Sequence, residues 1–171
     1  MKNKKRLAVV AIFTALCLLL SYLESLLPSI FPFIPFAKLG LSNIVILYTL
    51  ICFGIGEGIL VMGFKCLIMG LISGNPFMIL YSLMGGILSV AVEFFLIKLG
   101  KNSIIAISAA GGIFHALGQV AMASILTGSS SPFVYLPHLT IFSAIAGIFT
   151  GFLVWILVTR IPEKLIYSKN E

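Results

Sequence analysis

The sequence predicts an all-α integral membrane protein built as a bundle of six transmembrane helices. Its 171 residues are 60% hydrophobic and only 9% charged, too apolar for one water-soluble fold to hide. A helix needs about 20 mostly apolar residues to cross a bilayer. The mean hydropathy of +1.19 indicates that such stretches fill most of the chain. We therefore expect one transmembrane domain over residues 1–171, with lipid covering much of its surface.

The first apolar run, residues 7–27, follows a cluster of basic residues at the N-terminus. A secretory signal has a similar basic start, but its apolar core is shorter, about 7–15 residues, and ends at a small-residue cleavage site. This run instead continues to Leu27 and ends at Pro28. We interpret it as a retained transmembrane helix.

Five further apolar runs follow, separated by Pro-rich and Gly-rich breaks that favour turns. They cover residues 39–53, 58–72, 77–97, 104–126 and 136–159. The second and third runs of the chain are short for a span. They are either less tilted, broken, or a hairpin that does not fully cross.

Basic residues predict the orientation, because Lys and Arg are retained on the cytoplasmic side. With six spans and a cytoplasmic N-terminus, nine of the eleven basic residues lie inside. These nine are Lys2, Lys4, Lys5, Arg6, Lys98, Lys101, Arg160, Lys164 and Lys169. Both termini are therefore expected in the cytoplasm. The net charge of +6 is explained by topology, and no nucleic-acid partner is expected.

Several kinds of catalysis lack the residues they need. The sequence contains no Asp, so it has no Asp-rich magnesium motif and no Ser-His-Asp triad. It also has no phosphate-binding loop of the G-x-x-x-x-G-K-[ST] type. Cys17, Cys52 and Cys66 lie in apolar runs without metal-site spacing. We predict a protein that is not an enzyme and has no metal site or cofactor of its own.

Polar residues in or next to the spans are the candidate ligand contacts, because ionisable groups are costly in hydrocarbon. The predicted topology places many of them on the outer half of the bundle. The candidate substrate-binding residues are Glu24, Lys38, Asn43, Asn75, Tyr81, Ser82, His115, Gln119, Tyr135 and His138.

Some of these residues have a structural alternative. Glu24 and Lys38 are as well explained by an interfacial ion pair as by ligand contact. Lys65 lies within the third run and is expected to pair with Glu93, more as a structural pair than as a substrate site. Glu57 starts the third run, where the helix dipole favours a carboxylate.

His115 and Gln119 are four residues apart and therefore face the same direction on a helix. Together they favour a ligand site, although membrane His and Gln also hydrogen-bond neighbouring helices. His138 opens the last run and is expected at the membrane interface.

Small residues predict a partner surface on the first helix. Helices in lipid associate by close backbone approach at Gly, Ala and Ser. Ala11 and Ala15 form such a pair near the cytoplasmic end, with Ala8 beside them. We expect this face to dock a partner subunit, and the glycine pairs elsewhere to pack helices within the chain.

Three motifs in order along the chain resemble a known family. They are KLGLSN at residues 38–43, YSLMGGILS at 81–89 and HALGQ at 115–119. The sequence is similar to the Gx transporter family, also labelled heptaprenyl diphosphate synthase component I, over nearly its whole length. That family is in turn similar to the S components of energy-coupling factor (ECF) vitamin importers, which have six helices and an Ala-x-x-x-Ala face.

The resemblance implies a substrate-binding subunit in the plasma membrane of a bacterium. Its ligand would be a small molecule such as a vitamin, a flavin or an isoprenoid-related compound. Its partners would be an energising transmembrane subunit and two ATPase subunits. The family label implies an alternative, namely a non-catalytic membrane subunit for heptaprenyl diphosphate and menaquinone synthesis. The resemblance also implies that family members occur beside proteins of flavin-linked extracellular electron transfer, which gives a second alternative, a membrane partner in flavin- or quinone-linked electron transfer.

Overall fold

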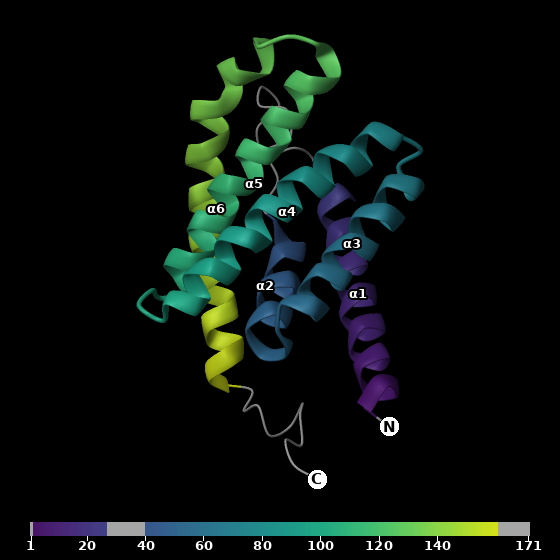
Figure 1. The fold of residues 1–171 in the computed structure, drawn as a ribbon, viewed down its shortest axis with the longest axis vertical. Helices are drawn as coiled ribbons and strands as arrows, with labels where there is room; N and C mark the ends of the chain where they lie inside the picture. The colour runs from purple at the N-terminus through teal and green to yellow at the C-terminus, as the bar shows by residue number, and fades with distance from the viewer. Residues whose placement is uncertain (1, 27–39, 161–171) are drawn as a thin grey trace.

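A computed structural model describes residues 2–26 and 40–160 of the chain. The elements in these ranges are helices, and their order is shown in Figure 1. They are α1 (Lys2–Leu26), α2 (Leu41–Phe53), α3 (Ile55–Ile72), α4 (Pro76–Leu99), α5 (Ile104–Thr127), the short 3-10 helix η1 (Ser131–Tyr135) and α6 (Leu136–Arg160). The predicted all-α membrane bundle is confirmed.

Five of the described helices are long and apolar enough to cross a membrane, namely α1, α3, α4, α5 and α6. The chain is therefore a multi-pass membrane protein. The third run was expected to be short, but α3 begins at Ile55, three residues before the predicted start, and has 18 residues. Only Gly54 separates α3 from α2, and its φ of 102° is open to glycine but rare for other residues.

The short helix α2 has only 13 residues, and a bundle of other helices surrounds it. Every side chain from Ile44 to Leu50 is buried, on all sides of the helix. A helix that is apolar all round belongs to a protein interior. Its neighbours α1, α3 and α6 cover it, so α2 lies in the core of the bundle despite its short length.

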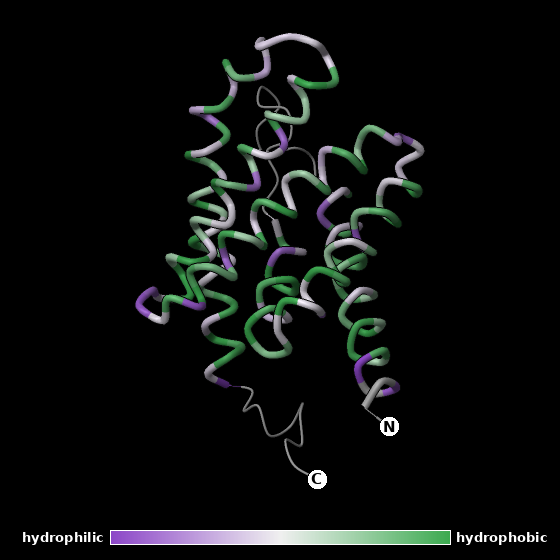
Figure 2. The backbone as a smooth tube through the Cα atoms, in the orientation of Figure 1, coloured by the Kyte–Doolittle hydropathy of each residue, from purple (hydrophilic) through white to green (hydrophobic). Residues whose placement is uncertain are grey.

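The helices run alternately up and down between two ends of the molecule (Figure 1). The start of α1, the turn between α2 and α3, the turn between α4 and α5 and the end of α6 lie toward one end. The turns after α3 and α5 lie toward the other. Figure 2 shows hydrophilic positions at several of these ends, while the helices between them are mostly hydrophobic.

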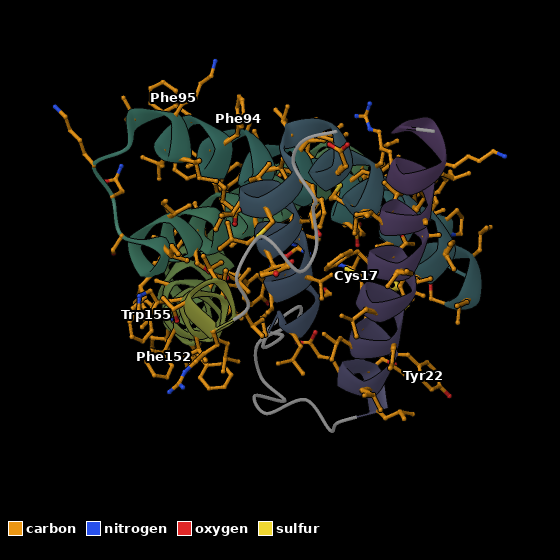
Figure 3. All side chains as sticks on the ribbon, turned by 90° about the horizontal axis from the view of Figure 1, so that it is seen from below. Cys17, Tyr22, Phe94, Phe95, Phe152 and Trp155 are labelled. Atoms are coloured by element: carbon orange, nitrogen blue, oxygen red, sulfur yellow. The ribbon has the colours of Figure 1, made fainter. Side chains whose placement is uncertain are left out.

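Large apolar side chains cover the outside of the bundle. Figure 3 shows Tyr22 on α1, Phe95 on α4 and Trp155 on α6 pointing away from the neighbouring helices, whereas Cys17 points inward. About half of the Trp155 side chain is exposed, and Cys17 is fully buried. In a membrane this outer surface faces lipid, which removes the cost of exposing it to water.

Helix α5 is held between α4 and α6 by very close backbone contacts. A Cβ atom added at Gly118 of α5 would lie 2.7 Å from the carbonyl oxygen of Met84 on α4. One added at Gly147 of α6 would lie 2.7 Å from both the Cα of Ala109 and the carbonyl oxygen of Ser108 on α5. Neither position can accept a side chain unless the two helices move apart.

One ion pair joins α1 to α3 at the predicted inner end of the bundle. Arg6 Nε lies 2.5 Å from Glu57 Oε1, and Glu57 sits in the first turn of α3 as expected from the helix dipole. The pair fixes the start of α1 against the start of α3.

The glycine contacts predict the effect of adding one methyl group. Gly147→Ala is expected to destabilise the bundle by about 1–3 kcal/mol, because the added Cβ meets backbone atoms that cannot turn away. Unfolding of the detergent-purified protein, followed by circular dichroism, measures the loss. Gly63→Ala is the matched control, since a Cβ at Gly63 meets no atom within 4 Å. Equal stability of the two variants would contradict the prediction.

Candidate ligand-binding site

All six α-helices contribute to one polar cavity inside the bundle. Its volume is about 120 Å³, and it runs from the end of α1 deep into the interior. Its charged, amide and aromatic polar residues, together with the hydroxyl residue Ser82 beside Tyr81, are Glu24, Asn43, Lys65, Tyr81, Ser82, Glu93, His115 and Gln119. Six of these eight were among the predicted substrate-binding residues, and the remaining two are Lys65 and Glu93.

The outer end of the cavity is formed where α1 ends and α2 begins. Glu24 Oε1 accepts a hydrogen bond of 2.6 Å from the backbone N–H of Gly40, the N-cap residue of α2. The carbonyl oxygen of Gly40 accepts a bond of 2.8 Å from the N–H of Asn43. The expected ion pair between Glu24 and Lys38 falls outside the described residues, because Lys38 is not among them.

The middle of the cavity lies where α5 crosses α4. His115 and Gln119 both face the cavity from α5, as their spacing predicts, opposite Gly85 on α4. A Cβ at Gly85 would lie 2.9 Å from the His115 carbonyl oxygen and 3.1 Å from Gln119 Cγ. These two side chains therefore pack against the neighbouring helix and line the cavity at the same time.

The inner end of the cavity contains Glu93, whose side chain is only 3% exposed. The hydroxyl of Ser89 donates a hydrogen bond of 3.3 Å to Glu93 Oε1. Lys65 lines the same cavity from α3, but the expected ion pair between Lys65 and Glu93 does not form within 4.0 Å. The two charged groups therefore remain separate in the described structure, and that expectation is wrong.

Hydroxyl groups on α5 and α6 form part of the wall and were not predicted. Ser108 on α5 and Thr150 on α6 share a hydrogen bond of 2.9 Å between their hydroxyl groups. Ser143, which precedes Thr150 on α6, also lines the cavity. On α5 the lining positions are 108, 112, 115 and 119, a spacing of three and four residues. Residues three and four apart lie on the same face of a helix, so the sequence alone could have predicted that these positions line one wall.

A second pocket of about 250 Å³ adjoins the polar cavity and has an apolar wall. Tyr81 and Gln119 line both spaces, and Tyr135 and Leu139 belong to the second. Neither space alone reaches the roughly 300 Å³ at which sites for drug-sized ligands begin, but the two together do. A ligand with a polar part and an apolar part would fit this arrangement.

Two candidate residues lie away from both pockets. Asn75 is the N-cap of α4, and its side-chain oxygen accepts a hydrogen bond of 3.0 Å from the N–H of Phe77. His138 is exposed in the first turn of α6. The structure gives Asn75 a capping role, and it does not bring His138 into the cavity.

The predicted docking residues lie together on the outside of α1. Ala8, Ala11 and Ala15 are all exposed, whereas Val10 and Cys17 on the other side of the helix are buried. No described side chain of the bundle therefore covers this small-residue face fully.

Comparison with known proteins identifies the family. The model of the family described as heptaprenyl diphosphate synthase component I matches residues 13–157. This range includes all six long helices in whole or in part, so the chain belongs to that family. The searches of curated proteins and of solved structures found no significant match.

If the cavity admits water from the outer side, a thiol placed in its wall will react with a membrane-impermeant thiol reagent. In a background without Cys17, Cys52 and Cys66, Ser143→Cys is expected to be labelled in intact cells. Ile145→Cys on the same helix is the control, because this side chain is 59% exposed on the apolar outer surface. A thiol in lipid forms little of the reactive thiolate. Labelling of both or of neither variant would contradict an open polar cavity.

Proposed function

We propose that this family member is the substrate-binding subunit of an ECF-type importer, which captures a small molecule on the outer side of the membrane. The observation that carries the proposal is the polar cavity to which all six α-helices contribute. Polar groups inside a membrane bundle are costly and mark ligand pathways. The adjoining apolar pocket suits a vitamin, a flavin or an isoprenoid-related compound with an apolar part.

In this proposal the chain itself does no chemistry. An energising transmembrane subunit and two ATPase subunits would supply the energy in trans, because the sequence has no phosphate-binding loop. The protein would lie in a bacterial plasma membrane with both termini in the cytoplasm. The ends of α1, α4 and α6 that lie toward one side of Figure 1 carry Arg6, Lys98 and Arg160, in agreement with the positive-inside rule.

The small-residue face of α1 is proposed as the contact with the energising subunit. Ala8, Ala11 and Ala15 allow a partner helix to approach the α1 backbone closely. Because these residues are outside the cavity, docking and ligand binding can be separated experimentally.

The docking proposal predicts that Ala11→Trp or Ala15→Trp prevents assembly but preserves ligand binding. Co-purification with a co-expressed energising subunit and ATPase pair should fall by at least tenfold, because an indole blocks close helix approach. The retained small molecule, detected by native mass spectrometry, should be unchanged. Leu23→Trp is the control on an exposed outer part of α1. Unchanged assembly in both Ala variants would reject this docking face.

The family description favours a second function, support of a prenyl diphosphate synthase as a membrane component. The lack of Asp would restrict this chain to binding a substrate or product for a separate catalytic subunit.

This second function predicts that a soluble catalytic partner, reconstituted with the chain in liposomes, makes longer or more abundant prenyl diphosphates than it makes with empty liposomes. Chromatography of the products measures the difference. The same product length and yield in both reactions would exclude a synthase role.

A further inference from the structure

Glu93 is a charged residue of the cavity that is buried without a cation partner among the described residues. Its carboxylate is almost fully buried in the inner half of α4, where an unpaired charge costs several kcal/mol. Among the described residues no cation lies within ion-pair distance of it, and Ser89 is its hydrogen-bond donor. One hydroxyl leaves most of the acceptor capacity of a carboxylate unused.

The neighbouring helix is shaped to hold this carboxylate. A Cβ added at Gly111 of α5 would lie 2.7 Å from Glu93 Cδ and 2.8 Å from Glu93 Cγ. Such distances are below any normal contact, so the Glu93 side chain occupies the space that a residue other than glycine would take. The carboxylate is thus held in a fitted position at the end of the cavity.

The other described polar groups around the inner cavity, apart from Ser89, do not hydrogen-bond or ion-pair with the Glu93 carboxylate. Ser108 and Thr150 hydrogen-bond each other, and Lys65 lines the wall without pairing with the carboxylate. Lys65 and His115 line the same cavity.

We propose that Glu93 recognises a protonated amine or a ring N–H donor of the transported molecule, at the inner end of the cavity. This assigns the substrate to the class of cationic or N–H-donating small molecules. The inference rests on the proposed function, because it places the ligand in the same cavity. A charge-assisted hydrogen bond between an ammonium and a buried carboxylate is among the stronger polar contacts in proteins.

Two small probes with the same phenyl tail and opposite charge test the proposal. Phenethylamine carries an ammonium group and hydrocinnamate a carboxylate, each on a two-carbon linker. Binding of both to the detergent-purified protein is measured by thermal shift and by native mass spectrometry. The wild-type chain should bind phenethylamine, and Glu93→Gln should weaken this binding at least tenfold. Its effect on hydrocinnamate should be less than twofold, because that probe has no donor for Glu93.

Matched variants separate recognition from folding. Gly111→Ala should reduce phenethylamine binding as Glu93→Gln does, since its Cβ displaces the carboxylate. Gly63→Ala, which meets open space, and Glu57→Gln, which changes the carboxylate paired with Arg6 outside the cavity, should leave phenethylamine binding unchanged. Monodisperse elution and an unchanged helical spectrum show that each variant is folded.

Three results would overturn the assignment. The first is that phenethylamine does not bind to the wild-type chain. The second is that Glu93→Gln weakens the binding of both probes equally. The third is that the wild-type chain is more stable in sodium chloride than in choline chloride and that this difference disappears in Glu93→Gln. The last result would assign the carboxylate to an inorganic cation. If a retained small molecule is still found in the wild-type protein, the substrate-binding function stands and only the ligand class fails. Its absence, together with unaffected assembly of the Ala11→Trp variant, would reject the function itself.

Discussion

The close backbone contact of α5 with α4 and α6 is the constraint on which the rest of the bundle depends. Lipid provides no hydrophobic force between helices, so association relies on packing and interhelical hydrogen bonds. Gly118 and Gly147 allow α5 to touch backbone atoms on both sides. Because these contacts fix the positions of three helices, they also fix the distance across which cavity side chains face each other. The remaining helices α1, α2 and α3 then close the cavity from the opposite side.

The same helix faces that make these contacts also carry the polar groups. On α5, His115 and Gln119 are interleaved with Gly111 and Gly118, so close contact and cavity wall alternate along one helix. A large side chain at the glycines would separate the helices and leave the polar residues in contact with lipid. Small residues therefore stabilise the bundle and keep its polar interior away from hydrocarbon, where each unsatisfied group costs several kcal/mol.

The sequence predicted the fold well because membrane helices leave a strong signal in composition and hydropathy. The start of α3 was missed by three residues, since glycines between residues 54 and 58 resemble a turn but continue into a helix. In the candidate site, the spacing of His115 and Gln119 was sufficient to place them together. Asn75 was assigned to the ligand, although an Asn before a Pro is also typical of a helix N-cap, the role it has here.

Other parts of the site depend on how helices rotate against each other, which one sequence does not determine. Lys65 and Glu93 face the same cavity from α3 and α4, but their charged ends do not meet, and hydropathy carries no information on this distance. The sequence does not single out Ser108 and Thr150, because hydroxyl residues are common in membrane helices and often bond their own backbone. Only the packing of α5 on α6 pairs them with each other.

The three described carboxylates lie at separate places in the bundle. Glu57 is paired with Arg6 at one end of the bundle, Glu24 accepts from the Gly40 backbone at the other, and Glu93 lies deep between them. A metal-bound diphosphate needs several carboxylates that converge on the same ions. Among the described residues no three acidic, histidine or cysteine side chains are grouped in that way. Each described carboxylate instead has its own local partner or space, and two of the three, Glu24 and Glu93, line the polar cavity.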